Sequence, residues 1–329
     1  MTVMYFDTVT TAETFWQSRR HFVEARGYLL NPLLQSQSVA RLQTRRPLRV
    51  EYHASQKALD VIDATRLADG RRVVIKGVPT PSDELTTLAS IHQGPSRTHP
   101  ANHCVPILEV FEDTNDPELS YIAMPSLGRI RSSTFRNVGD VVHFTSQILL
   151  GLDFMHAHHV AHRDCSLKNI MVEQSESRAH GPPSLSALPL LRHPYGPATL
   201  GLPRYYFVNF SRSVSQDPTK DNSENPLAND IFLVGDMLRR EFLTRYANVE
   251  FLQPLIECMI CSTLSRTSAS EALQEWHGIL PQVSLFRRGN RLRGRHEWWI
   301  QSVVLDAVWL LFRVFRETRR ALFNPISCL

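Results

Sequence analysis

The feature that most constrains this chain is a polar segment at residues 162–172, which reads His-Arg-Asp-Cys-Ser-Leu-Lys-Asn-Ile-Met-Val. It holds Asp164 and Asn169 at a fixed spacing, directly after a long stretch with helical periodicity. In that stretch, residues 138–158, the apolar positions are Val141, Val142, Phe144, Ile148, Leu149, Leu152 and Phe154. The sequence therefore predicts an amphipathic helix that leads directly into a polar loop.

The bulk composition is that of a globular protein. With 329 residues, 43% hydrophobic and 21% charged, the chain can bury a substantial core and form one large or two modest domains. No long uncharged apolar run occurs, and residues 1–16 lack the basic and apolar regions of a secretion signal. The five cysteines are scattered and odd in number, which is typical of reduced thiols. We therefore expect an intracellular protein, cytoplasmic or nuclear, in which Cys258 and Cys261 are buried thiols rather than metal ligands.

The net charge of +4 is unevenly distributed along the chain. Residues 284–329 contain nine arginines against Glu297, Asp306 and Glu317, which gives this tail +6, and subtraction from +4 leaves −2 for the remainder. A body that is slightly acidic does not offer the general basic surface that nucleic acids require. We expect no nucleic-acid partner.

Residue patterns predict a mostly β region followed by a helical one. Residues 12–31 are expected to form a helix, stopped at Gly27, and then an extended segment. Four β-rich runs are predicted as strands, at residues 58–65, 72–76, 105–111 and 121–124, and the first two flank a turn at 68–70. Ser82 is expected to cap a short helix that ends at His92. Later helices are predicted at 230–242, 251–264 and 268–280, after a long flexible insertion at 173–204.

The order of these landmarks resembles the protein-kinase superfamily over residues 50–282, and more narrowly the divergent kinase-like proteins common in mushroom-forming fungi. The segment 162–172 is similar to the catalytic loop of that family, and residues 230–235 are similar to the anchoring helix of its large lobe. The resemblance implies an α+β, two-lobed fold with a small β-rich N-lobe and a large, mainly helical C-lobe. The expected parts are a helical extension at 1–49, an N-lobe at 50–125, a C-lobe at 126–283 and a helical tail at 284–329.

The resemblance also implies roles for individual residues in binding ATP and Mg²⁺. Asp164 is the expected catalytic base, Asn169 a metal ligand, and Lys168 the lysine that accompanies the base in an arrangement nearer the tyrosine-kinase pattern, which leaves the hydroxyl class open. The remaining implied residues are Lys76 on the nucleotide phosphates, Glu84 as its ion-pair partner, Met124 as gatekeeper and the Leu127 backbone facing adenine. Taken singly, Lys76 is equally consistent with an ion pair in a β core, and Asp164 with the cap of a turn.

Three departures from the family argue against ordinary kinase activity. Asn209 stands where the family keeps its metal-binding aspartate, and a neutral amide in place of a carboxylate would weaken metal-nucleotide binding by roughly 1.5–3 kcal/mol, or about ten- to a hundredfold. Residues 45–66 contain no glycine, so the Gly-rich phosphate loop is absent. Residues 224–226, Glu-Asn-Pro, are at best a remnant of the Ala-Pro-Glu signature.

The tail contains an apolar helical pattern at 298–315, with a narrow polar stripe and flanking arginines. Because Asp306 lies near its middle, a membrane-spanning helix is not expected. Peripheral contact with an anionic membrane is one interpretation, and packing on the large lobe or on a partner is the favoured one.

Three functional hypotheses follow. The leading one is a pseudokinase or severely impaired kinase that retains weak ATP and Mg²⁺ binding and acts as a scaffold for a protein partner. The second is an active ATP-dependent kinase with Asp164 as base and a protein substrate. The third is an interaction module that does not bind nucleotide.

Overall fold

The computed structural model describes residues 4–30, 61–131, 134–173, 202–215, 225–260 and 267–323. The chain forms two compact units. The small unit comprises residues 1–92 and 105–126, and the large unit comprises 93–104 and 127–329. The small unit is β-rich and the large unit is mainly helical, so the fold is α+β and consistent with the predicted two-lobed, protein-kinase-like fold.

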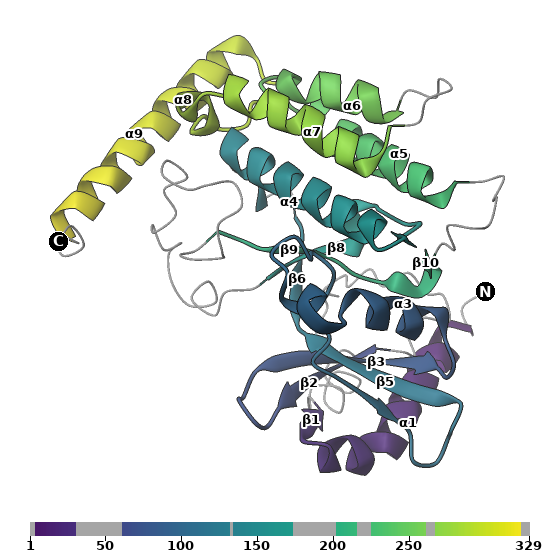
Figure 1. Cartoon of the computed structure of the whole chain (residues 1–329). Helices are drawn as coiled ribbons and strands as arrows, with labels where there is room; N and C mark the ends of the chain where they lie inside the picture. Colours follow the sequence, from purple (N-terminus) through teal and green to yellow (C-terminus); the bar gives the residue numbers. More distant parts are fainter. Residues whose placement is uncertain are drawn as a thin grey trace. The chain divides into compact units, whose positions relative to one another are not determined.

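A five-stranded antiparallel sheet forms the body of the small unit (Figure 1). Its strands, in spatial order, are β1 (Tyr28–Leu30), β2 (Val61–Arg66), β3 (Arg72–Pro79), β5 (Leu119–Pro125) and β4 (Glu109–Glu112). The predicted β2–β3 hairpin is confirmed from residue 61 on, and residues 58–60 of the first predicted run lie outside the described residues. Gly70 takes a positive φ of 70° in its turn. The strand predicted at 105–111 is shorter and starts at Glu109, since Pro106 has no N–H to offer a neighbouring strand.

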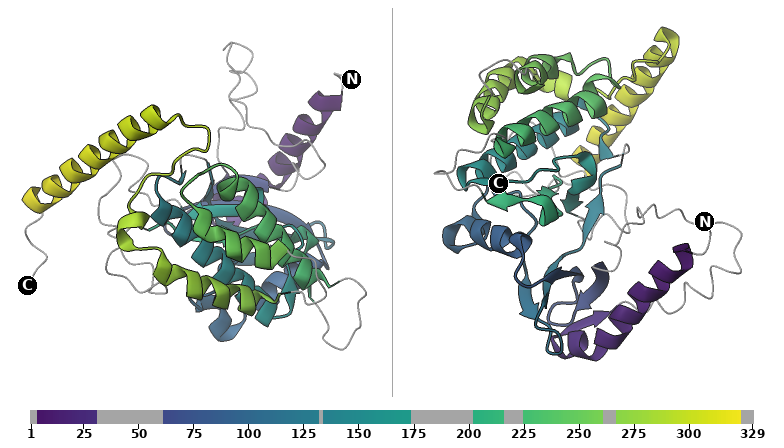
Figure 2. Two further views of the ribbon diagram at one scale, coloured as in Figure 1. Left: turned by 90° about the horizontal axis from the view of Figure 1, so that it is seen from above. Right: turned by 90° about the vertical axis from the view of Figure 1, so that its right-hand side faces the viewer.

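Helix α1 (Met4–Ala25) packs on this sheet and shares its core (Figure 2). Trp16 and Val23 are buried in the same apolar cluster as Tyr121, and the ring centroids of Trp16 and Tyr121 lie 5.8 Å apart. Arg19 of the same helix donates to Asp113 at 2.9 Å. The predicted amino-terminal helix is therefore part of the hydrophobic core of the small unit.

The short helix α3 (Asp83–Ile91) begins where the sequence predicts. The Ser82 hydroxyl accepts a hydrogen bond from the backbone N–H of Leu85, as expected of an N-cap. His92 ends the helix. The cap therefore places Glu84 in the first helical turn.

The large unit is built around α4 (Val138–Ala157), whose start is fixed by a capping box between Asn137 and Asp140. Three helices lie on one side of α4 in Figure 1: α5 (Pro226–Leu238), α6 (Gln253–Ile260) and α7 (Ala269–Ile279). The buried Trp276 Nε1 of α7 donates to Ser146 Oγ of α4 at 2.8 Å. On the other side of α4 lie two small sheets, formed by β6 (Leu127–Arg129), β8 (Ile170–Glu173) and β9 (Tyr205–Phe207), and by β7 (Val160–Ala161) and β10 (Val214–Ser215).

Helix ends in the large unit differ from the predicted ones for local reasons. Helix α5 begins before the predicted 230 because the Asn225 side chain caps the N–H groups of Leu227 and Ala228, and it continues as a π-helical turn at Arg239–Leu243. Helix α6 starts only at Gln253, after a 3₁₀ turn. Residues 174–201 of the predicted insertion lie outside the described residues. So do residues 261–266, which include Cys261 and the end of the helix predicted at 251–264.

The tail consists of α8 (Leu285–Arg288) and the long helix α9 (Trp299–Phe323). Helix α9 confirms the predicted tail helix and runs beyond it. In the described part of the chain, no helix combines the length and apolarity needed to cross a membrane. The cysteines in the described ranges, Cys104, Cys165 and Cys258, are free thiols.

Candidate functional site

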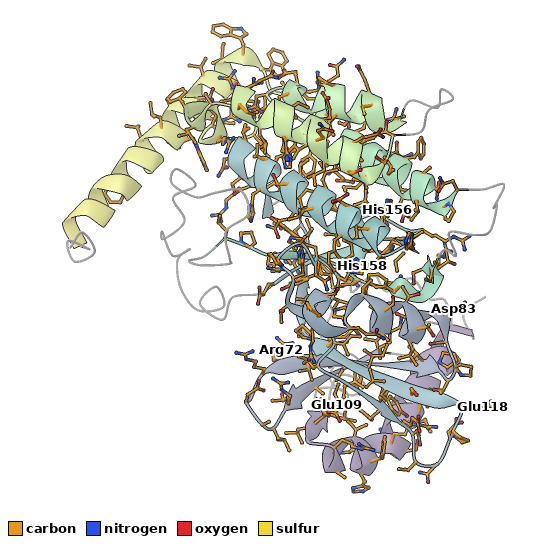
Figure 3. The ribbon with its side chains drawn as sticks, viewed as in Figure 1. Arg72, Asp83, Glu109, Glu118, His156 and His158 are labelled. Carbon is orange, nitrogen blue, oxygen red and sulfur yellow. The ribbon has the colours of Figure 1, made fainter. Side chains whose placement is uncertain are left out.

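The polar loop that follows α4 is held in place by a buried carboxylate. Asp230 on α5 is fully buried, and its two oxygens accept hydrogen bonds of 2.6 Å from the backbone N–H groups of His162 and Arg163. His156, labelled near the end of α4 in Figure 3, lies 3.4 Å from the same carboxylate. Arg163 takes a positive φ of 64°, which these two hydrogen bonds help to hold. The backbone before Asp164 is thus fixed by the next helical layer.

The side chain of Asp164 is partly exposed and accepts two polar contacts from its own loop. Ser166 Oγ donates to Oδ1 at 3.0 Å, and Lys168 Nζ lies 3.3 Å from Oδ2. Partial burial acts to raise the pKa of Asp164, but the contacts from Ser166 and Lys168 outweigh it and leave the pKa below its ordinary value. Asp164 is therefore ionised at neutral pH, as a proton-accepting or hydroxyl-orienting group requires.

Asn169 and Asn209, which are forty residues apart in sequence, meet beside Asp164. Pairing of β8 with β9 brings the two segments together, and the Val208 N–H donates to the Asn169 carbonyl at 2.9 Å. Asn209 has a left-handed backbone, and its Nδ2 donates to Asn169 Oδ1 at 3.3 Å. Asn169 Nδ2 in turn donates to the Asp164 carbonyl at 2.9 Å. The structure therefore gathers Asp164, Lys168, Asn169 and Asn209 into one cluster.

The donor set of this cluster does not suit a magnesium ion, which prefers anionic oxygens in an octahedral arrangement. Both side-chain oxygens offered by the asparagines are neutral, and both accept internal hydrogen bonds, Asn169 Oδ1 from Asn209 and Asn209 Oδ1 from Ser211. Among the described residues, no group of three or more His, Cys, Asp or Glu could hold a metal ion. Asp217 and Asp221 follow Asn209 in the sequence but lie outside the described residues.

The small unit contains the second group of predicted residues. Lys76 Nζ on β3 contacts both carboxylate oxygens of Glu84 on α3, at 2.6 and 2.7 Å. The two side chains are only 14% and 9% exposed, so the pair is largely withdrawn from water. The predicted ion pair is thus present although only eight residues separate Lys76 from Glu84. Strand β3 ends at Pro79 and α3 starts at Asp83, so the chain reverses between the two residues and their side chains meet.

The two residues expected near adenine lie at the end of the small unit's sheet and at the start of the next strand. Met124 is on β5, opposite Val74 of β3. Leu127 is the first residue of β6 in the large unit, opposite Glu173 of β8.

Sequence reasoning placed Asp230 on an anchoring helix but missed its hydrogen bonds to the loop. The available signal was a single acid followed by the apolar run Ile-Phe-Leu-Val, since a carboxylate at a buried helix position requires donors from elsewhere. The contact of Ser166 with Asp164 was likewise missed. It is visible as a hydroxyl two residues after the carboxylate, a spacing at which side chains of a tight loop meet.

Comparison with known proteins shows partial similarity to a protein kinase. No protein-family model matches the chain. The chain is similar to NUAK family SNF1-like kinase 2 from Rattus norvegicus, with 29% identity over 156 residues. The match covers 44% of this chain but only 24% of the relative, so the chain spans about a quarter of that protein's length. Together with the α+β fold, the similarity supports a protein-kinase-like domain.

Proposed function

We propose that this protein is a pseudokinase, or a severely impaired kinase, which binds ATP with little contribution from a divalent metal and acts by binding a protein partner. One observation carries the proposal. Asn209 Nδ2 donates to Asn169 Oδ1, so two neutral amides are hydrogen-bonded together at the position where the resemblance implies metal ligands. The ion pair of Lys76 with Glu84 supports retained nucleotide binding, because it presents an ammonium group of the kind that contacts phosphates in the family.

The chemistry of phosphoryl transfer explains why these two features have different consequences. The reaction depends on positioning and on positive charge around the phosphates. A lysine supplies part of that charge for binding, but the transition state needs more, and a pair of neutral amides supplies none. Binding is therefore expected to survive better than transfer. A nucleotide that binds one conformation preferentially still shifts the population of that conformation, which is a property that a protein partner can detect.

The amino-acid composition of residues 31–60, between β1 and β2, also supports impaired phosphoryl transfer. They lie outside the described residues and contain no glycine. A phosphate loop needs glycines so that backbone N–H groups can approach the phosphates closely. A chain that lacks both these glycines and the metal-binding carboxylate should have a lower rate of phosphoryl transfer than a chain that lacks only one of the two.

Thermal unfolding with ATP tests the proposal directly. We expect ATP to raise Tm to a similar extent in excess EDTA and in excess Mg²⁺, because a ligand that binds only the native state stabilises it in proportion to occupancy. Lys76→Met should abolish the shift. Arg71→Met removes an exposed cation from the turn before the same strand and should leave the shift intact. A shift seen only with Mg²⁺ would contradict metal-independent binding, and no shift under any condition would favour the interaction module that does not bind nucleotide.

The second candidate function is an active kinase, and the ionised Asp164 with Lys168 beside it is the observation that favours it. Transfer of radiolabelled phosphate from ATP, with Mg²⁺ or Mn²⁺, separates the two candidates. Transfer by the native protein that is lost in Asp164→Ala would establish an enzyme. We expect no transfer above the level of Asp164→Ala.

A further inference from the structure

Helix α9 is attached to the large unit through its polar stripe. Arg291 Nε lies 2.7 Å from one Asp306 oxygen, and Arg293 forms an ion pair with the other. The Arg291 guanidinium also donates to Ser302, and Trp309 Nε1 donates to the Gly289 carbonyl at 3.0 Å. Ser302, Asp306 and Trp309 are spaced by four and three residues, so they form one stripe along the helix.

The opposite side of α9 is apolar and exposed to solvent. We call its residues the α9 apolar face: Trp299, Ile300, Val303, Val304, Leu310 and Leu311, which are between 55% and 75% exposed. At about 100° per residue, they cover roughly 140° of the helix circumference. A surface helix of a globular protein usually turns its apolar side inward and its polar side outward, so this helix is inverted. Figure 2 shows α9 extending beyond the other helices of the large unit.

We propose that the α9 apolar face docks on an anionic membrane surface, with the helix lying along the interface. Charge supports this occupant, because residues 284–329 carry +6 whereas the rest of the chain carries −2. By helical geometry, positions 313, 316 and 320, which are all Arg, fall on the side of the Ser302 stripe, away from the α9 apolar face. A basic side and an apolar side along one helix are the pattern of helices that lie in the headgroup region of membranes.

Two further features fit an interfacial position better than the alternatives. Trp298 and Trp299 are exposed at the start of the helix, and tryptophan is favoured at the level of the headgroups. Asp306 lies midway and is paired with arginines, which suits a helix that lies on a bilayer and not one that crosses it. Pairing with a second copy through the same face would bring two tails of +6 together, and their repulsion opposes it.

Flotation of the full-length protein with liposomes tests the proposal. Vesicles of phosphatidylcholine alone are compared with phosphatidylcholine vesicles to which about 30% phosphatidylserine is added. We expect flotation with the anionic vesicles, little with neutral ones, and a decrease as salt is raised. Val304→Glu with Leu311→Glu places two charges in the α9 apolar face and should lower the partition coefficient at least tenfold. The matched control, Gln274→Glu with Gln282→Glu, adds the same charge at exposed sites elsewhere in the large unit and should change it little.

A second pair of variants tests the basic side separately. Each arginine near an anionic surface contributes about a fivefold factor in partitioning. Arg316→Gln with Arg320→Gln should therefore weaken binding to anionic vesicles by roughly 25-fold without affecting neutral ones. Equal flotation of native protein and Val304→Glu/Leu311→Glu would overturn the proposal. So would absence of flotation combined with a dimer in light scattering that those two substitutions dissociate, which would assign the face to a second copy.

Discussion

Asp230 binds the backbone of the segment that contains the candidate base, with 2.6 Å hydrogen bonds from the N–H groups of both His162 and Arg163. The carboxylate is fully buried, so both of its oxygens are committed to the loop instead of to water. The loop geometry around Asp164 thus depends on a residue more than sixty positions later in the chain.

Asp230→Asn should destabilise the protein by about 1–3 kcal/mol. The amide oxygen can accept from only one of the two backbone N–H groups, and the amide N–H₂ would then face the other N–H group, which is also a donor. Urea denaturation monitored by tryptophan fluorescence measures this loss. Asp236→Asn provides the control on the same helix, since Asp236 pairs with the exposed Arg239 and Arg240, and loss of its charge should cost less than about 1 kcal/mol. Equal losses would show that the anchoring role assigned to Asp230 is wrong.

Asn209→Asp tests the role assigned to the amide pair. A carboxylate at this position should raise ATP affinity in Mg²⁺ by about ten- to a hundredfold, because a hard cation then gains an anionic ligand. In EDTA the same change should weaken ATP binding, since the new charge repels the triphosphate. Isothermal titration calorimetry under both conditions measures the two effects.

The change in ATP affinity caused by Asn209→Asp should have opposite signs in Mg²⁺ and in EDTA, and this reversal identifies position 209 as a metal position. Gln274→Glu, on the exposed side of α7, makes the same change in net charge and should alter ATP affinity in neither condition. If Asn209→Asp left the affinity in Mg²⁺ unchanged, then position 209 would not be a metal position, and the alignment of Asn209 with the family's aspartate would be wrong.

Local features were predictable because their causes lie within a few residues of each other. Ser82 caps α3 through an N–H only three residues away, and the turn at Gly70 depends on a conformation that glycine adopts easily. The amphipathic pattern of 138–158 likewise predicted α4 to within a residue at its end.

Long-range contacts were not predictable in the same way. Asn209 meets Asn169 only because β8 and β9 pair, and no local pattern states which amide faces which. The orientation of α9 was also unexpected, since its apolar residues favoured packing on the large lobe or a partner. In the structure, Arg291 and Arg293 hold the helix by Asp306 instead, and ion pairs at such separations depend on tertiary geometry.

The ion pair of Lys76 and Glu84 offers a test by a double-mutant cycle. Lys76→Met alone should cost about 1–3 kcal/mol, because it leaves a poorly solvated carboxylate without its partner. Lys76→Met combined with Glu84→Gln should be less destabilising than the sum of the single changes, since neither charge is then left alone. Urea denaturation of the four proteins gives the coupling energy.

The same four proteins separate stability from ligand binding. The double variant should lose less stability than the sum of the two single changes, but it should not show the ATP-dependent rise in Tm, because the ammonium group proposed to contact the phosphates is still missing. A double variant that still responds to ATP would remove Lys76 from the nucleotide site while leaving its structural role intact.

The buried His103 predicts how stability depends on pH. Its Nδ1 lies 2.8 Å from the Tyr205 carbonyl, and burial lowers the pKa of His103 to about 3, despite that hydrogen bond. In the unfolded chain the imidazole titrates near its ordinary pKa of about 6.5. Between these two values the unfolded state binds a proton that the folded state does not, so the free energy of unfolding should fall as pH decreases, by up to about 1.4 kcal/mol per pH unit.

Urea denaturation at intervals between pH 7 and pH 4 measures that slope. His103→Gln should reduce the slope of unfolding free energy against pH by up to about 1.4 kcal/mol per pH unit, the contribution of one proton. This holds even if the substitution lowers stability at every pH, because the slope depends only on the difference in bound protons between the unfolded and folded states. His143, whose pKa is also lowered by burial, should account for part of the slope that remains. An unchanged slope in His103→Gln would mean that His103 takes up its proton without unfolding, and the burial argument would fail.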